Sequence, residues 1–130
     1  MDVRLLRARS RAMLSQLGHG DSELSIALVD DAEIRRLNDE WRGKKRSTDV
    51  LSFSLLEGDG ARHRGKLLGD VVISVETAAR QATARHRGLD EEIGRLVVHG
   101  LLHILGHDHE DAAEAKIMRA EQRRLWRAVG

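Results

Sequence analysis

Polar and apolar residues alternate with two periodicities along this chain, and each periodicity indicates a type of secondary structure. Leucine and alanine recur at helical intervals from Val3 to Leu17, so a helix is expected there. The stretch Glu23–Val29 alternates apolar and polar positions one by one, which is typical of a half-buried strand. Asp49–Leu55 and Gly69–Val75 are predicted to be the second and third strands.

The other periodic segments predict helices, and Gly and Asp mark their ends because the chain has no proline. Asp30 is expected to cap the helix that follows it, and Asp90 the helix that ends at Gly106. Residues Glu57–Gly65 are expected to form a loop. The predicted helices after the first cover residues 32–41, 76–86, 89–106 and 110–129.

This order of elements favours a single α+β domain over residues 1–130, with a small mixed sheet covered by helices. The length of 130 residues, with 41% hydrophobic and 33% charged residues, suits one globular domain with one core. We expect no membrane span and no secretory signal, because no long uninterrupted apolar stretch is present. The absence of cysteine excludes disulfides and thiolate metal sites, and a cytoplasmic location is expected.

Four of the seven histidines lie within the stretch "VVHGLLHILGHDHED", residues Val97–Asp111. His99 and His103 are one helical turn apart, so both project from one face of the predicted helix. Gly106 allows the chain to turn out of the helix, and His109 can then fold back over the same face. Three imidazoles leave a fourth position open on a tetrahedral metal, which is typical of catalytic rather than structural sites.

We therefore predict a metal site on His99, His103 and His109. Nitrogen ligands favour zinc, one ion per chain, and leave nickel, cobalt and copper as alternatives. His107 would point away from a site shared by its neighbours, so we expect it to support the site from outside or to lie on the surface.

The spacing of these histidines is also that of the metzincin proteases, with one change. In those enzymes a glutamate after the first histidine serves as general base, whereas this chain has Gly100 there. Met118, which would have to supply the Met-turn, falls inside a predicted helix. The pattern therefore favours a metzincin-like helix without peptidase chemistry. RNA cleavage tolerates the loss of this base, because a ribose 2′-hydroxyl or a hydroxide on the metal can attack phosphorus.

A second informative stretch is "EWRGKKRSTDVLSFS", which places four cations just before a predicted strand: Arg42, Lys44, Lys45 and Arg46. A run of charge is often no more than a solvated loop. Beside a metal site that lacks a peptidase base, this run favours an edge that binds RNA phosphates. The net charge of +1 and the small number of aromatic residues argue against RNA binding by the stacking of many bases.

Trp41 and Asp70 each have two candidate roles. Trp41 can offer one stacking face to a base, but we expect it to pack in the core. Asp70 in "LLGDVVIS" either helps to orient the site or is a turn residue at the start of the third strand.

Three stretches together resemble the YbeY-type endoribonucleases, which are bacterial rRNA maturation factors: "LNDEWRGKKRSTDVLSFS", "LLGDVVIS" and "VVHGLLHILGHDHED". They span Leu37–Asp111, and the last predicted helix also fits. The resemblance implies a zinc ion on His99, His103 and His109, with His99 and Arg42 as catalytic residues. It implies cleavage of single-stranded RNA in 16S rRNA 3′-end maturation and ribosome quality control. The implied partners are the small ribosomal subunit, ribosomal protein S11 and the Era GTPase.

The sequence departs from the family pattern at several positions. Ser47 and Ser54 stand where proline is usual around "TDVLSF", and His107 stands where an aromatic residue is common. The family's first strand, which precedes the first helix, is missing from the predicted order. Either the sheet has one strand fewer, or the start of the protein lies upstream.

Two other functions stay open on the sequence. A zinc hydrolase of peptides or small esters would need another base, for which Glu110 and Asp111 are the nearby candidates. A non-catalytic ribosome-assembly module would use zinc solely to hold the last helices together.

Overall fold

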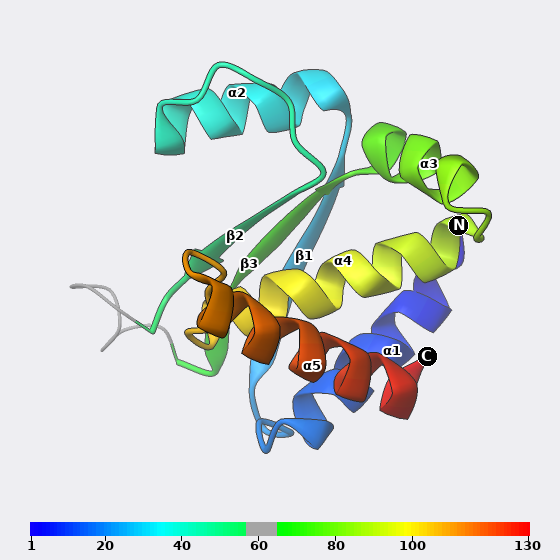
Figure 1. Ribbon diagram of the computed structural model, residues 1–130, viewed down its shortest axis with the longest axis vertical. Helices are drawn as coiled ribbons and strands as arrows, with labels where there is room; N and C mark the ends of the chain where they lie inside the picture. The colour runs from blue at the N-terminus through cyan, green and yellow to red at the C-terminus, as the bar shows by residue number, and fades with distance from the viewer. Residues whose placement is uncertain (57–64) are drawn as a thin grey trace.

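The computed structural model describes residues 1–56 and 65–130, so the loop expected over Glu57–Gly65 lies almost entirely outside the described residues. Within them, the helices and strands follow one another in the predicted order (Figure 1). The elements are α1 (Val3–Gln16), β1 (Glu23–Val29), α2 (Asp31–Arg42), β2 (Val50–Ser54), β3 (Leu67–Ser74), α3 (Val75–Ala84), α4 (Leu89–Ile104) and α5 (Ala112–Val129).

The strands form a mixed sheet in the order β1–β3–β2. β3 lies in the middle, parallel to β1 and antiparallel to β2. This arrangement confirms the predicted α+β fold with a small mixed sheet. Because β2 is an outer strand of this sheet, the segment that leads into it, with its four cations, lies at the edge of the fold.

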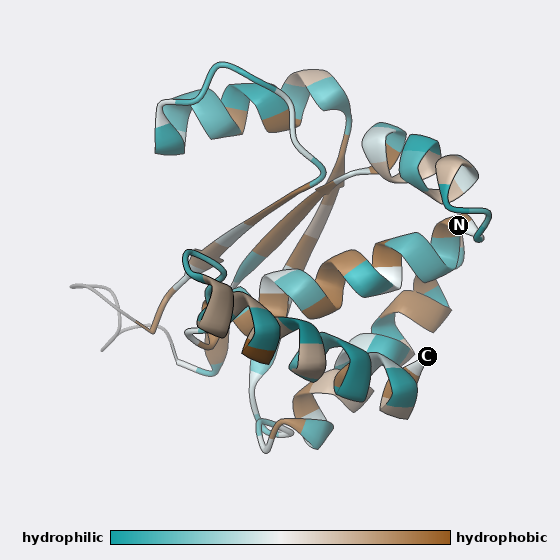
Figure 2. Cartoon of the chain, in the orientation of Figure 1, coloured by the Kyte–Doolittle hydropathy of each residue, from teal (hydrophilic) through white to brown (hydrophobic). Residues whose placement is uncertain are grey.

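Helices cover both faces of the sheet (Figure 1). α4 crosses one face and packs against β2 and β3, while α1 and α5 pack against α4; α2 lies against β2 and β3 on the other face. Figure 2 shows that the strands are mostly hydrophobic and that α5 is largely hydrophilic. Among the described residues, no helix combines the length and the hydropathy needed to cross a membrane.

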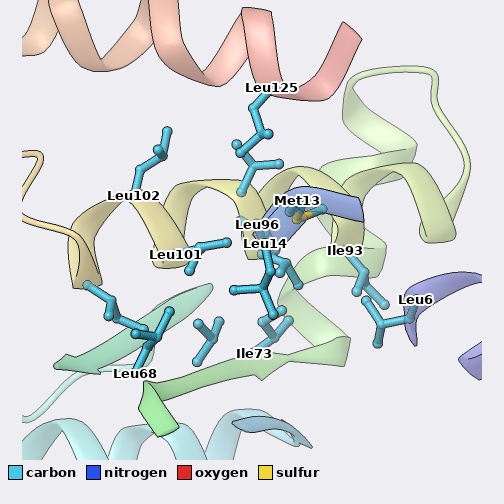
Figure 3. Packing of buried hydrophobic residues seen from close by; sticks show 14 of the residues in the cluster. Leu6, Met13, Leu14, Leu68, Ile73, Ile93, Leu96, Leu101, Leu102 and Leu125 are labelled. Carbon is cyan, nitrogen blue, oxygen red and sulfur yellow. The ribbon is translucent and has the colours of Figure 1, made fainter. Parts of the chain in front are cut away.

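The main core joins α4 to the sheet on one side and to α1 and α5 on the other (Figure 3). Burying a side chain of leucine size stabilises a fold by about 1.5–3 kcal/mol, so this packing fixes the rotation of α4 about its axis. His99 and His103 lie on the remaining side of α4, where both are half-buried. Fully buried members from four elements include Met13, Ile73, Leu101 and Leu125. A smaller cluster joins α2 to the opposite face of the sheet: Ile34, Leu51 and Val72.

One predicted helix cap is confirmed and one is wrong. The Asp30 side chain accepts a hydrogen bond from the Glu33 N–H at 2.8 Å and caps α2. Asp90 does not cap α4, because Gly88 occupies the cap position and Asp90 lies in the first turn. Its carboxylate instead accepts the Asp2 N–H at 2.8 Å, which ties the beginning of α1 to α4. An acid in the first turn suits the positive end of a helix as well as an acid at the cap does.

Candidate metal centre and basic groove

The structure brings together the three histidines predicted to bind a metal. His99 and His103 lie on α4, and His109 lies in the connection to α5. The ring centroids are 4.7 Å apart for His99 and His103, 5.1 Å for His103 and His109, and 5.9 Å for His99 and His109. One nitrogen from each ring lies within 4.8 Å of the others. This set of neutral nitrogen donors suits a single transition-metal ion after small rotations of the rings.

A Schellman motif at the end of α4 returns the chain toward this site. The Gly106 N–H donates to the His103 carbonyl at 3.0 Å, and the His107 N–H donates to the Leu102 carbonyl at 3.0 Å. Gly106 has a φ of 102°, which other residues rarely adopt. Gly106 therefore ends the helical segment as predicted, and the turn brings His109 over the histidine face of α4.

α5 supplies a partner for His99 that the sequence did not reveal. The amide nitrogen of Gln122 lies 2.5 Å from Nδ1 of His99. A neutral imidazole with its proton on Nδ1 has its lone pair on Nε2. If the Gln122 amide is turned by 180°, its oxygen accepts a hydrogen bond from that Nδ1–H. Gln122 can therefore fix the tautomer of His99 that leaves Nε2 available to a metal.

The surroundings keep the two helix histidines neutral. Burial, followed by the neighbouring His103, lowers the pKa of His99 to about 4, while Asp49 acts in the opposite direction. Burial and the adjoining His109 lower the pKa of His103. Both rings are therefore uncharged at pH 7, which is the form that binds metal. The positive charge of Arg42 also lowers the pKa of His103, so Arg42 acts electrostatically within the site.

A groove of about 660 Å³ lies beside the histidines, between α4 and the outer strand β2. Three of the four predicted cations line this basic groove, namely Arg42, Lys44 and Arg46. Lys45 does not join them, because it lines a separate hollow with residues of α2. The Arg46 N–H donates to the Lys44 carbonyl at 2.9 Å, so Lys45 stands at the centre of a tight turn, apart from its two neighbours.

Two features of α2 position the loop of residues 43–46, which carries Lys44 and Arg46. Gly43 has a φ of 66° and ends the helix in the left-handed conformation. The buried side chain of Asn38 then donates a hydrogen bond from Nδ2 to the Arg46 carbonyl at 3.0 Å. The loop is thereby held against α2, with Arg42 and Lys44 directed into the groove.

The structure corrects two expectations about neighbouring residues. Trp41 is 66% exposed, so the expected core packing is wrong, and its ring meets the edge of Phe53 at 6.3 Å between centroids. Asp70 lies inside β3, not at its start. Val71 faces Gly100 of α4, and strand residues alternate between faces, so Asp70 points away from the histidines.

The structure also shows where the residues relevant to a peptidase reaction lie. Glu110 lines the basic groove, whereas the Asp111 carboxylate caps α5 by accepting the Glu114 N–H at 2.8 Å. Met118 is buried inside α5, as predicted, so it forms no Met-turn. His107 is half-buried and stands outside the group of three histidines that could hold a metal ion.

Sequence reasoning missed Asp49 and Gln122, both of which line cavities beside His99. Asp49 accepts hydrogen bonds from the Val50 N–H at 2.8 Å and the Gln81 amide at 3.2 Å. For Gln122, one signal was available: it lies four residues after Met118, which places both on the inward side of α5. Its contact with His99 depends on how α5 packs against α4, which no local pattern specifies.

The fold and the site together define a class: an α+β domain in which a helix presents a three-histidine site beside a basic groove. Within this class, the sequence model of the family described as endoribonuclease YbeY matches residues 4–130. The chain therefore belongs to the YbeY endoribonuclease family.

Individual relatives agree with this assignment. A protein of Anaeromyxobacter sp. (strain Fw109-5) named endoribonuclease YbeY is 53% identical over 98% of this chain, and this chain spans 65% of its length. A protein of Myxococcus xanthus, also named endoribonuclease YbeY, is 50% identical over 95% of this chain, and this chain spans 42% of its length. This chain therefore covers less than two thirds of these relatives. A solution structure from Thermotoga maritima superposes with a TM-score of 0.69 at 28% identity, covering 98% of this chain and 82% of the other.

Proposed function

We propose that this protein is a zinc-dependent endoribonuclease that cleaves single-stranded RNA in 16S rRNA 3′-end maturation and ribosome quality control. One observation carries the proposal. Three histidine nitrogens converge beside a groove that is lined by Arg42, Lys44 and Arg46. Such a groove matches a substrate whose backbone carries one negative charge per nucleotide. Membership of the YbeY endoribonuclease family supports the same assignment.

Each group has a distinct role in this proposal. His99, His103 and His109 would hold the zinc ion, which when bound supplies Lewis acidity toward a phosphate oxygen. Arg42 would donate two parallel hydrogen bonds from its planar guanidinium and stabilise the negative charge that develops on the phosphate. Lys44 and Arg46 would hold neighbouring phosphates as the walls of the groove.

The cellular setting is also part of the proposal. The small ribosomal subunit, ribosomal protein S11 and the Era GTPase are its proposed partners, and the cytoplasm is its proposed location. These assignments rest on membership of the family alone.

Arg42→Ala tests the proposed role of Arg42. We expect the cleavage rate to fall by about 10²–10³-fold, the usual effect of removing one donor to a developing charge. Zinc content should not change, because Arg42 is not one of the ligands. The measurements are initial rates on labelled single-stranded RNA and elemental analysis of the same preparations.

Arg35→Ala is the matched control, since Arg35 is an exposed arginine of the same helix that lies outside the groove. Equal losses in the two variants, or loss of zinc from Arg42→Ala, would contradict a role in the transition state.

Gln122→Leu tests the support that Gln122 gives to His99. Removing a hydrogen-bond partner of a metal-ligating histidine typically costs about 10–100-fold in metal affinity. We therefore expect zinc to bind Gln122→Leu more weakly by about that factor, as measured by competition with a chelating dye. Gln122→Glu keeps an acceptor for the Nδ1 proton and should retain most of the affinity. Equal zinc affinities of Gln122→Leu and the wild type would show that Gln122 does not support metal binding by His99.

A second candidate, a zinc hydrolase of peptides or small esters, is favoured by one observation: Glu110 lines the groove and can serve as a base. Hydrolysis of peptides that survives Arg42→Ala would favour it. A third outcome, a metal-loaded protein that binds RNA and never cleaves it, would favour the assembly module.

A further inference from the structure

A second cleft shares His99 and Asp49 with the basic groove, so the two cavities meet at the candidate metal site. It has a volume of about 450 Å³ and lies among the C-terminal end of α3, α4 and α5. We call it the arginine cleft, because four arginines line it: Arg85, Arg95, Arg119 and Arg123.

Two of these arginines already neutralise carboxylates. Arg85 forms an ion pair with Glu92, which is 1% exposed, and Arg87 lies 3.3 Å from the other oxygen of the same carboxylate. Arg95 Nε lies 2.8 Å from Glu91 on the same helix. The buried carboxylate of Glu92 needs such partners, and Arg95 also lies over the Trp126 ring at 5.0 Å from its centroid. Arg85 and Arg95 therefore have structural roles that require no ligand.

Arg119 and Arg123 are different. In the described part of the chain, neither forms an ion pair or a side-chain hydrogen bond. By contrast, Arg124 on the same helix pairs with Glu121 at 2.9 Å. Arg119 and Arg123 are exposed and one turn apart, so their like charges repel each other. An anion held between them would relieve this repulsion.

We propose that the arginine cleft binds phosphates of the RNA strand next to the site of cleavage, with Arg119 and Arg123 as the contacting residues. This inference rests on the proposed function as an endoribonuclease. The guanidinium fork matches the geometry of a phosphodiester. Among the described residues, the cleft is lined by no Phe, Tyr or Trp, so it would hold the RNA backbone mainly through charge and would not select a base sequence.

The junction of the two cavities determines the path of the strand. An RNA that crosses the site at His99 would be held by the cations of the basic groove on one side and by Arg119 and Arg123 on the other. Asp49 stands at this junction, and its charge is moderated by hydrogen bonds from the Val50 N–H and the Gln81 amide. The cleavage site should therefore need nucleotides on both sides for tight binding.

The test compares two double variants that lose the same charge. Arg119→Gln/Arg123→Gln removes both free cations of the cleft. Arg7→Gln/Arg11→Gln is the control, because these exposed arginines have the same spacing on α1 and lie outside both cavities. Binding of 2′-O-methyl single-stranded RNA is measured by fluorescence anisotropy over a range of salt concentrations. Steady-state cleavage of the unmodified RNA and zinc content are measured on the same proteins.

We expect the cleft variant to bind RNA about tenfold more weakly at about 0.15 M salt, with a salt slope smaller by about 1.4, as two lost phosphate contacts require. KM should rise while kcat and zinc content stay unchanged, because the lost contacts hold substrate and transition state equally. RNAs shortened from one end should bind the wild type and the control more weakly. The same shortening should leave the affinity of the cleft variant for RNA unchanged.

The outcomes separate this inference from the function on which it rests. If the cleft variant matches the control in RNA affinity and salt slope, the arginine cleft does not bind RNA phosphates, and the proposed nuclease function is unaffected. Loss of zinc from the cleft variant would also overturn it, because the arginines would then act through the metal site. Retained RNA affinity with lost binding to a ribosomal protein would assign the cleft to a protein partner. A wild type that neither binds nor cleaves RNA would overturn the proposed function itself.

Discussion

The His103→Ala variant is expected to lose its bound metal and its RNA cleavage together. The ring centroid of His103 lies 4.7 Å from that of His99 and 5.1 Å from that of His109. Its removal leaves two of the three candidate nitrogen donors, His99 and His109, whereas a catalytic zinc site uses three protein ligands. A Lewis acid supplies several kcal/mol at the transition state, so we expect cleavage to fall by about 10³-fold or more.

The fold of this variant should survive, because alanine favours helix and the His103 side chain is half-exposed. Circular dichroism of the metal-free proteins checks this point. His19→Ala is the control, since His19 lies in the turn after α1, far along the chain from the site, and its ring has no role there. Full cleavage by a zinc-free His103→Ala protein would reject the metal-dependent reaction.

Features of the site that depend on one segment could be predicted from the sequence. The spacing of His99 and His103 within one helix fixes their common face, and Gly106 fixes where the chain leaves that helix. The order of helices and strands followed from hydrophobic periodicity for the same reason. In each case the pattern that carries the information and the geometry that it determines lie within a few residues.

Features that depend on packing between segments could not be predicted in this way. Gln122 reaches His99 through the contact of α5 with α4, and Trp41 is exposed although its residue type suggested burial. Lys45 stands among three cations in the sequence but faces another hollow. Asp90 was assigned to a cap whose position is occupied by Gly88. A single chain carries no local signal for which side of a loop or helix its neighbours will cover.

Gly100→Glu, which would restore the glutamate of the metzincin pattern, is expected to unfold the protein and to create no peptidase. Gly100 is buried where α4 crosses β3. A Cβ at this position would lie 2.9 Å and 3.0 Å from the two methyl groups of Val71. A glutamate would therefore be forced between helix and strand, and burying its carboxyl group without a partner costs several kcal/mol. Stabilities of domains are about 5–15 kcal/mol in total.

Smaller changes at the same contact measure the crowding itself. Gly100→Ala should gain about 0.8–1.0 kcal/mol from helix propensity and lose about 1–3 kcal/mol from overpacking against Val71. Val71→Ala makes room, so the double variant should be more stable than the sum of the two single changes predicts. Urea denaturation of the four proteins gives each free energy of unfolding.

Ala120→Glu, at an exposed position of α5, controls for the introduction of a helical glutamate and should unfold at the same urea concentration as the wild type. A folded Gly100→Glu protein with an unchanged midpoint would show that α4 can move away from β3. If the expected unfolding occurs, the missing base has a structural cause. The position that carries a general base in the metzincin pattern is used here to bring α4 into contact with the sheet, and that contact presents His99 and His103 to the groove.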